Sequence, residues 1–141
     1  MAEKMGADEA IPADESQDAA LRRIAPMGFD LVFEATGSAD IVQRTFQYVK
    51  GGGKIVLYGI VPPEHQAAIN PFDICRKDLQ VIGSFSSINA CSMAHELLAG
   101  NVIQVEPFIS HRFSLDQWGE AVAMARDHKT CMRAIVLTPA S

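Results

Sequence analysis

The chain has 141 residues, of which 48% are hydrophobic and 21% charged, and its formal net charge is −5. That is enough sequence to bury a real core. A pI near 5.3 without a basic run argues against nucleic acid as the main partner, because phosphate binding needs clustered Lys and Arg. No apolar stretch approaches the ~20 residues that cross a bilayer, so we expect no membrane partner.

The start of the chain and its cysteines indicate the compartment. The first ten residues are acidic and helix-forming, unlike a signal sequence with a basic start and an apolar centre. The three cysteines, Cys75, Cys91 and Cys131, are widely spaced and contain no CxxC pair. We therefore expect neither a disulfide framework nor a structural zinc knuckle, and we predict a cytoplasmic protein.

The first elements in chain order are short. The pattern predicts the end of a helix at residues 3–5 with Gly6 as its C-terminal glycine, an extended piece at 9–11, and a helix at 16–24. Next, the run DLVFEATG predicts a strand that is buried on both faces and ends at a turn of small residues.

A helix and a second strand follow that turn. Ser38 can cap the helix, and we expect the glycines at 51–53 to end it before a strand at 54–58. Strand, helix and strand in this order form the βαβ unit of a parallel sheet. Beyond a loop, the pattern predicts a helical turn at 72–76, a strand at 79–85, a helix at 91–99, an extended piece at 108–113, a helix from 114 to 127 that begins with a capping box, and a last strand at 133–138.

Three of these strands end in small residues: Ala35-Thr36-Gly37, Gly59, and Gly83-Ser84. The carboxyl ends of parallel strands lie together, and ligands bind along that edge. Glycine and alanine there let a ligand approach the backbone closely, although at any one position the glycine can simply begin a turn. Together they predict that a flat or extended ligand lies across the strand ends.

Other candidate motifs fail on inspection. Glycines 51–53 and Lys54 lead into a strand, whereas a phosphate loop leads into a helix. Cys91 and His95 share a helix face but supply only two ligands, so we expect no metal site, and no residue stands out as catalytic. Glu34 is a nearly buried acid that needs partners. It is a structural hydrogen-bond acceptor, our favoured interpretation, or it lines the ligand cleft.

The ordered motifs GADEAI, GFDLVFEATG, GGGKIVLYGI, LQVIGSF, EPFISHRFSLDQ and MRAIVL resemble the C-terminal part of the zinc-type medium-chain alcohol and polyol dehydrogenases. The resemblance covers nearly the whole chain and implies hydride transfer between an alcohol carbon and NAD or NADP, with zinc as the Lewis acid. It implies an α/β fold with a partial Rossmann-like parallel sheet, strands 4-5-6 of the family order, that lacks the first two βα units. Residues 1–86 would be the partial nucleotide-binding domain, and residues 87–141 the tail of the catalytic domain.

The sequence also departs from the family pattern. It contains no G-x-G-x-x-G turn, no catalytic cysteine-histidine set and no four-cysteine lobe. We therefore expect a fragment that is inactive alone, with weak or no cofactor binding and with zinc only in the parent enzyme. The alternatives are a non-catalytic assembly module and part of a zinc-free quinone-reductase-like enzyme.

The resemblance also implies a cofactor site and a partner. The matching positions are Ala35, Thr36 and Gly37 beside the ribose and pyrophosphate, Tyr58, Gly59 and Ile60 beside the nicotinamide, Ser84, Phe85 and Ser86 at the carboxamide, and Arg133 at the pyrophosphate. In the family the strand at 79–85 pairs with its copy in another subunit. We therefore expect a homo-oligomer, at least a dimer through this strand.

Overall fold

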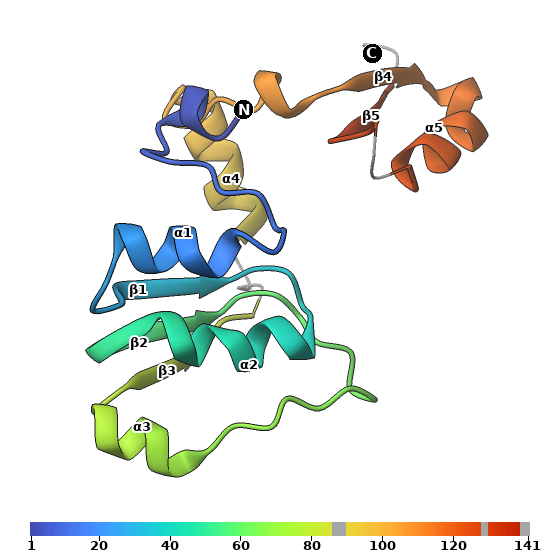
Figure 1. The fold of residues 1–141 in the computed structure, drawn as a ribbon. Helices are drawn as coiled ribbons and strands as arrows, with labels where there is room; N and C mark the ends of the chain where they lie inside the picture. Colours follow the sequence, from blue (N-terminus) through green and yellow to red (C-terminus); the bar gives the residue numbers. More distant parts are fainter. Residues whose placement is uncertain (86–89, 128–129, 139–141) are drawn as a thin grey trace. The chain divides into compact units, whose positions relative to one another are not determined.

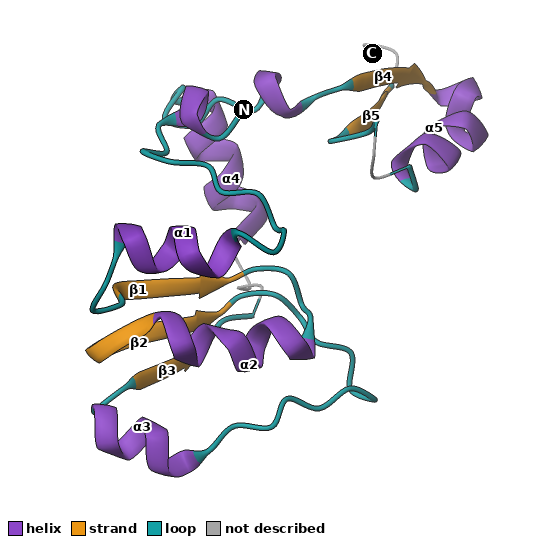
Figure 2. Cartoon of the chain, viewed as in Figure 1, coloured by secondary structure: helices purple, strands orange, loops and turns teal. Residues whose placement is uncertain are grey.

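The computed structural model describes residues 1–85, 90–127 and 130–138. The chain divides into two compact units, Met1–Ser86 and Ser87–Ser141, and each contains its own small parallel sheet (Figures 1 and 2). The roles expected for them, nucleotide binding and a catalytic-domain tail, stay predictions. None of the described helices is both long and apolar enough to span a membrane.

The first unit is built on three parallel strands in the order β1-β2-β3. These strands are β1 (Phe29–Glu34), β2 (Val49–Leu57) and β3 (Gln80–Gly83). Helix α2 (Ala39–Tyr48) packs on β1 and β2, and α3 (Pro71–Lys77) packs on β2 (Figure 1). Asn70 begins α3 by accepting a hydrogen bond from the Phe72 amide at 3.0 Å. The α/β fold with a parallel sheet, expected from the βαβ pattern, is confirmed.

The core lies between the sheet and these two helices. Ile55 of β2 is fully buried and clusters with Val49 and Leu79. Partly buried apolar side chains close the cluster from the strands and from both helices: Val32, Leu57, Phe46 and Ile74. Alternate residues of a strand point to opposite faces, so Val32 and Glu34 share the helix-covered face with their β2 partners.

The opposite face of the sheet carries apolar side chains that are exposed in this chain. Leu31 and Phe33 of β1 are 45% and 63% exposed, and Ile82 of β3 is 43% exposed. The prediction that the DLVFEATG strand is buried on both faces is therefore wrong. Its apolar run reads as a central strand, but here β1 is an edge strand with a helix layer on one face only.

The glycines at 51–53 lie within β2 and do not end the preceding helix, which corrects the prediction. Helix α2 ends at Tyr48, and Phe29 pairs with Val49 whereas Leu31 pairs with Lys54. Strand β2 thus carries extra residues across this interval, as in a bulge. Gly52 takes a φ of 72°, a conformation that favours glycine.

The N-terminal segment packs as a helical extension. A single 3-10 turn, η1 (Glu3–Met5), ends at Gly6 in the left-handed conformation, and α1 (Gln17–Ile24) follows. The expected extended piece at 9–11 forms no strand in either sheet. Glu9 instead pairs with Arg23 of α1 at 2.7 Å. A strand needs a neighbour to satisfy its backbone, and the described residues place none beside this segment.

The second unit contains a parallel pair of strands, β4 (His111–Ser114) and β5 (Ala134–Leu137), with α5 (Trp118–Ala125) packed on both. The expected capping box is present, because the Gln117 side chain accepts from the Ser114 amide at 3.1 Å. The first turn of the predicted helix is a 3-10 turn, η3 (Leu115–Gln117), and α5 follows it. The unit also contains α4 (Ala90–Ala99), which is exposed along its length, and the 3-10 turn η2 (Glu106–Phe108).

Candidate functional site

The carboxyl ends of the three parallel strands meet at one edge of the first sheet. Glu34, Leu57 and Gly83 are neighbours across the sheet, so the turns that follow them emerge side by side. The Ser84 amide donates to the Leu57 carbonyl at 3.0 Å, which ties the third turn to the second. Eight of the ten matched positions belong to these turns, and a ninth, Ser86, lies outside the described residues.

Glu34 is the last residue of β1 at this end of the sheet and is only 1% exposed. One carboxylate oxygen accepts from the Thr36 amide at 2.7 Å and from the Thr36 hydroxyl, and the other accepts from the Gly37 amide at 3.4 Å. The favoured interpretation of Glu34 as a structural acceptor is confirmed. The spacing of Thr36 and Gly37, two and three residues after the acid, carried this signal in the sequence.

The small residues of the first two turns let those turns touch. A Cβ atom on Gly59 would lie 2.2 Å from the Gly37 amide nitrogen, and one on Gly37 would lie 2.6 Å from the Ile60 carbonyl oxygen. The amides of Tyr58 and Gly59 both donate to the Glu34 carbonyl at 2.8 Å. Gly37 and Gly59 are therefore needed for turn-to-turn packing, whatever else binds at this edge.

The edge presents exposed side chains and borders a hollow. Tyr58, Ile60 and Phe85 are 64%, 66% and 77% exposed. Next to Gly37 a hollow of about 660 Å³ opens between the start of α2 and the loop after β2. Its lining residues are Gly37, Ser38, Ala39, Asp40, Pro62, Glu64, His65 and Gln66. Sequence reasoning did not single out Pro62 and its neighbours, and their only signal was a position just beyond the end of β2.

Arg133 lies in the second unit, immediately before β5, and is exposed. Its backbone is held by Ser110, whose hydroxyl oxygen accepts from the Arg133 amide at 3.1 Å and from the Met132 amide at 3.0 Å. The Arg133 carbonyl accepts in turn from the Ser110 amide at 3.0 Å. No sequence pattern indicated this role of Ser110, and a role of Arg133 toward a pyrophosphate stays a prediction.

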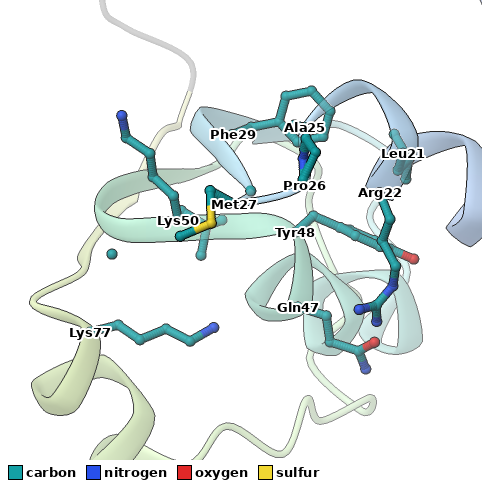
Figure 3. A pocket seen from close by; sticks show the side chains of 13 residues that line it. Leu21, Arg22, Ala25, Pro26, Met27, Phe29, Gln47, Tyr48, Lys50 and Lys77 are labelled. Carbon is teal, nitrogen blue, oxygen red and sulfur yellow. The ribbon is translucent and has the colours of Figure 1, made fainter.

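A second hollow of about 180 Å³ lies at the amino ends of β1 and β2 (Figure 3). Three cationic residues, Arg22, Lys50 and Lys77, are among its lining residues. Lys50 pairs with Asp30 at 2.5 Å, and the Lys77 ammonium donates to the Phe46 carbonyl at 2.9 Å. Two of the three cations are thus used within the fold, which makes this a weaker candidate for a ligand site.

Tyr48, which lines the second hollow, also links α1 to α2. Its hydroxyl donates to Asp18 at 2.5 Å, and the Arg44 guanidinium donates to the same carboxylate oxygen at 2.7 Å. These two bonds, the Tyr48 bond first, hold the pKa of Asp18 below its usual value. Burial and the Asp18 carboxylate raise the pKa of Tyr48. The network is structural, because it joins two helices and lies away from the carboxyl ends of the strands.

The described residues offer no metal centre. Nowhere in residues 1–85, 90–127 and 130–138 do three or more His, Cys, Asp or Glu side chains gather as metal ligands. A zinc site needs three or four such ligands in tetrahedral positions, so the residues described do not fit zinc. The turns after β1, β2 and β3 form a continuous edge with exposed side chains beside a hollow, which is the part of a parallel sheet where ligands bind in general.

Comparison with known proteins gives the family. The family model described as "Zinc-binding dehydrogenase" matches residues 1–105. The chain belongs to the zinc-binding dehydrogenase family. It is 31% identical over 120 residues to D-arabinitol dehydrogenase 1 of Uromyces fabae, a match that covers 82% of this chain and 34% of that protein. It is 28% identical over 140 residues to the sorbitol dehydrogenase of Bacillus subtilis, covering 96% and 39%.

Solved structures of other dehydrogenases share the fold of this chain. A zinc-binding dehydrogenase from Sinorhizobium meliloti, solved with NADP bound, superposes with a TM-score of 0.82 at 29% identity, covering 96% of this chain and 41% of that one. An Escherichia coli protein described as a short chain alcohol dehydrogenase, solved with NADH, superposes with a TM-score of 0.83 at 20% identity, which shows the shared fold. This zinc-binding dehydrogenase chain therefore spans about 34–41% of the length of these relatives.

Proposed function

We propose that this chain contributes one side of the nicotinamide cofactor cleft of an alcohol or polyol dehydrogenase. The observation that carries the proposal is the shared edge at which β1, β2 and β3 end, with exposed turns in a member of the zinc-binding dehydrogenase family. Relatives named for D-arabinitol and sorbitol support the polyol class of substrate. The NADP bound to the related Sinorhizobium enzyme supports a nicotinamide dinucleotide as the ligand.

The residues of this chain would bind and orient the cofactor. When bound, NAD or NADP supplies the acceptor for a hydride from an alcohol carbon. The turn at 35–37 would contact the ribose, and the turn at 58–60 would lie beside the nicotinamide. Ser84 and Phe85 would contact the carboxamide. No step is assigned to zinc, because the described residues do not form its site.

We expect the chain to bind the dinucleotide weakly. Pyrophosphate is normally anchored by a glycine turn at a helix N-terminus, and this sequence has no G-x-G-x-x-G. Calorimetry with NADH and NADPH should give a dissociation constant weaker than about 10 micromolar, or roughly −7 kcal/mol. Arg133→Ala should weaken any binding further, because its guanidinium is the phosphate-pairing group in the proposal, whereas Arg126→Ala, an exposed arginine of the same unit, should not. Tighter binding, or equal effects of the two substitutions, would contradict this part of the proposal.

We also expect no measurable dehydrogenase turnover from these 141 residues alone. Without a metal to lower its pKa, an alcohol loses its proton only with difficulty near neutral pH. The assay uses the purified chain, added zinc, NAD or NADP and a panel of polyols, with a sorbitol dehydrogenase as the positive control. Zinc-dependent turnover above the background without protein would overturn the expectation.

We further propose that two copies of the chain form a dimer in which their β3 strands pair edge to edge. This strand is at an edge of the sheet, all of its residues are exposed, and two of them are the apolar Val81 and Ile82. Such edges pair readily with another chain. The same geometry supports the alternative of an assembly module without catalysis, which would share the dimer but show no cofactor binding.

Sedimentation tests the pairing and identifies the edge. We expect a species of twice the 15.3 kDa chain at tens of micromolar. Ile82→Lys should produce monomers, because a charge on a paired edge opposes association. Phe33→Lys, on the opposite edge strand, serves as the matched control and should leave the dimer intact. A wild-type monomer, or dissociation by Phe33→Lys instead, would contradict pairing through β3.

A further inference from the structure

We propose that Glu34 is a positioning residue for the cofactor edge, by which we mean the edge at which β1, β2 and β3 end. It positions this edge by tying the turn after β1 to the turn after β2. The inference rests on the proposed function and deepens it, because it says which residue holds the proposed cofactor edge in shape. Glu34 is almost fully buried, and both its side chain and its backbone carbonyl are engaged at the strand ends.

The side chain holds the first turn. Both carboxylate oxygens are used, one by the amide and hydroxyl of Thr36 and the other by the Gly37 amide. All three of these groups are hydrogen-bond donors. A carboxylate can accept from all of them, because each of its two oxygens is an acceptor. A leucine at position 34 could pack against Leu57, its partner on β2, but it would leave the two turn amides without this acceptor.

The backbone of the same residue holds the second turn. The Glu34 carbonyl accepts from the amides of Tyr58 and Gly59, both at 2.8 Å. The carboxylate oxygen that binds Gly37 also lies 2.8 Å from where a Cβ of Gly59 would be. The two turns are therefore positioned against one residue, and a displacement of Glu34 would move both.

This arrangement limits what the first turn can offer a cofactor. The amides of Thr36 and Gly37 point inward to Glu34, so a phosphate would have to compete with a buried carboxylate for those donors. These two amides are therefore not free for a ligand, whereas the Glu34 side chain does not occupy the carbonyl oxygens of the turn. Carbonyl oxygens accept hydrogen bonds from hydroxyl groups, so the turn suits the ribose hydroxyls of the cofactor and does not suit its pyrophosphate.

Amide hydrogen exchange on the ¹⁵N-labelled chain tests the tie without any ligand. Glu34→Gln keeps the shape of the side chain but puts an amide nitrogen where one acceptor was. We expect exchange at Thr36 and Gly37 to accelerate about tenfold, while exchange at Ile55 in the core stays unchanged. NADH-induced shifts at Tyr58 and Gly59 should shrink in the same variant. Unchanged exchange at Thr36 and Gly37, or undiminished NADH shifts, would overturn the positioning role.

A pair of substitutions at Thr36 keeps the proposal testable if Glu34→Gln fails to fold. Thr36→Ser retains the hydroxyl donor and should behave like the wild type, whereas Thr36→Val retains the shape and should accelerate exchange at Gly37. The reverse order would show that packing alone holds the turn. If the wild-type chain shows no NADH-induced shifts at all, the proposed cofactor edge fails, and the exchange data alone then decide whether Glu34 ties the two turns.

Discussion

Gly59→Ala is expected to destabilise the first unit by about 3 kcal/mol or more. The added methyl group would lie 2.2 Å from the Gly37 amide nitrogen and 2.8 Å from the Thr36 amide nitrogen. Both are backbone atoms that Glu34 fixes in place, so the strain cannot be relieved by rotating a side chain. The turns must separate, which would break the hydrogen bonds to the Glu34 carbonyl as well.

Gly83→Ala is the matched control, because a Cβ atom there meets nothing within 4 Å. We expect this control to change stability by about 0.5 kcal/mol or less. Urea unfolding followed by far-UV circular dichroism measures the difference. Trp118 is the only tryptophan and belongs to the second unit, so its fluorescence reports on that unit separately. Equal stabilities of the two variants would show that the turns are not packed as described.

Ile55→Ala is expected to cost about 2–5 kcal/mol of the free energy of unfolding of the first unit. Ile55 is fully buried, and Val49 and Leu79 form the rest of the buried cluster around it. Removing its outer carbons leaves a cavity between the sheet and α2 and α3. A small domain is stable by only about 5–15 kcal/mol in general, so this loss would remove a substantial share of the free energy of unfolding.

Two further variants calibrate the Ile55 result. Ile55→Val removes one methyl group and should cost about 0.5–1.5 kcal/mol. Ile24→Ala, at the end of α1 where the side chain is 37% exposed, should cost about 1 kcal/mol or less. The same unfolding curves measure all three. A loss at Ile24 as large as that at Ile55 would place the core of the unit elsewhere.

Local sequence patterns predicted the elements of this fold well. The strand at β1, the crossover helix α2 and the capping box at Ser114 each depend on residues close together in the chain. For the same reason the role of Glu34 was accessible, since its partners Thr36 and Gly37 follow within three residues. Local hydrogen bonds and hydrophobic periodicity carry this information without knowledge of the rest of the fold.

Features that depend on distant neighbours were not accessible. The local pattern predicts that Phe33 is a core residue. Its actual exposure depends on the position of β1 at the edge of the sheet and on whether another element covers that face. The glycines at 51–53 read as a helix stop, and only the pairing of β2 with β1 makes them part of a strand. Likewise, the path of the loop after β2 brings His65 to the hollow beside Gly37, and tertiary packing sets such a path.

The central claim is that the carboxyl ends of β1, β2 and β3 form one side of a nicotinamide cofactor cleft. Titration of the ¹⁵N-labelled chain with millimolar NADH, followed by amide chemical shifts, tests it most directly. We predict that the perturbed amides gather at residues 35–37, 58–60 and 84–85. Perturbations gathered instead around Tyr48 and Lys50, at the hollow on the opposite ends of the strands, or no perturbation in either place, would contradict the claim.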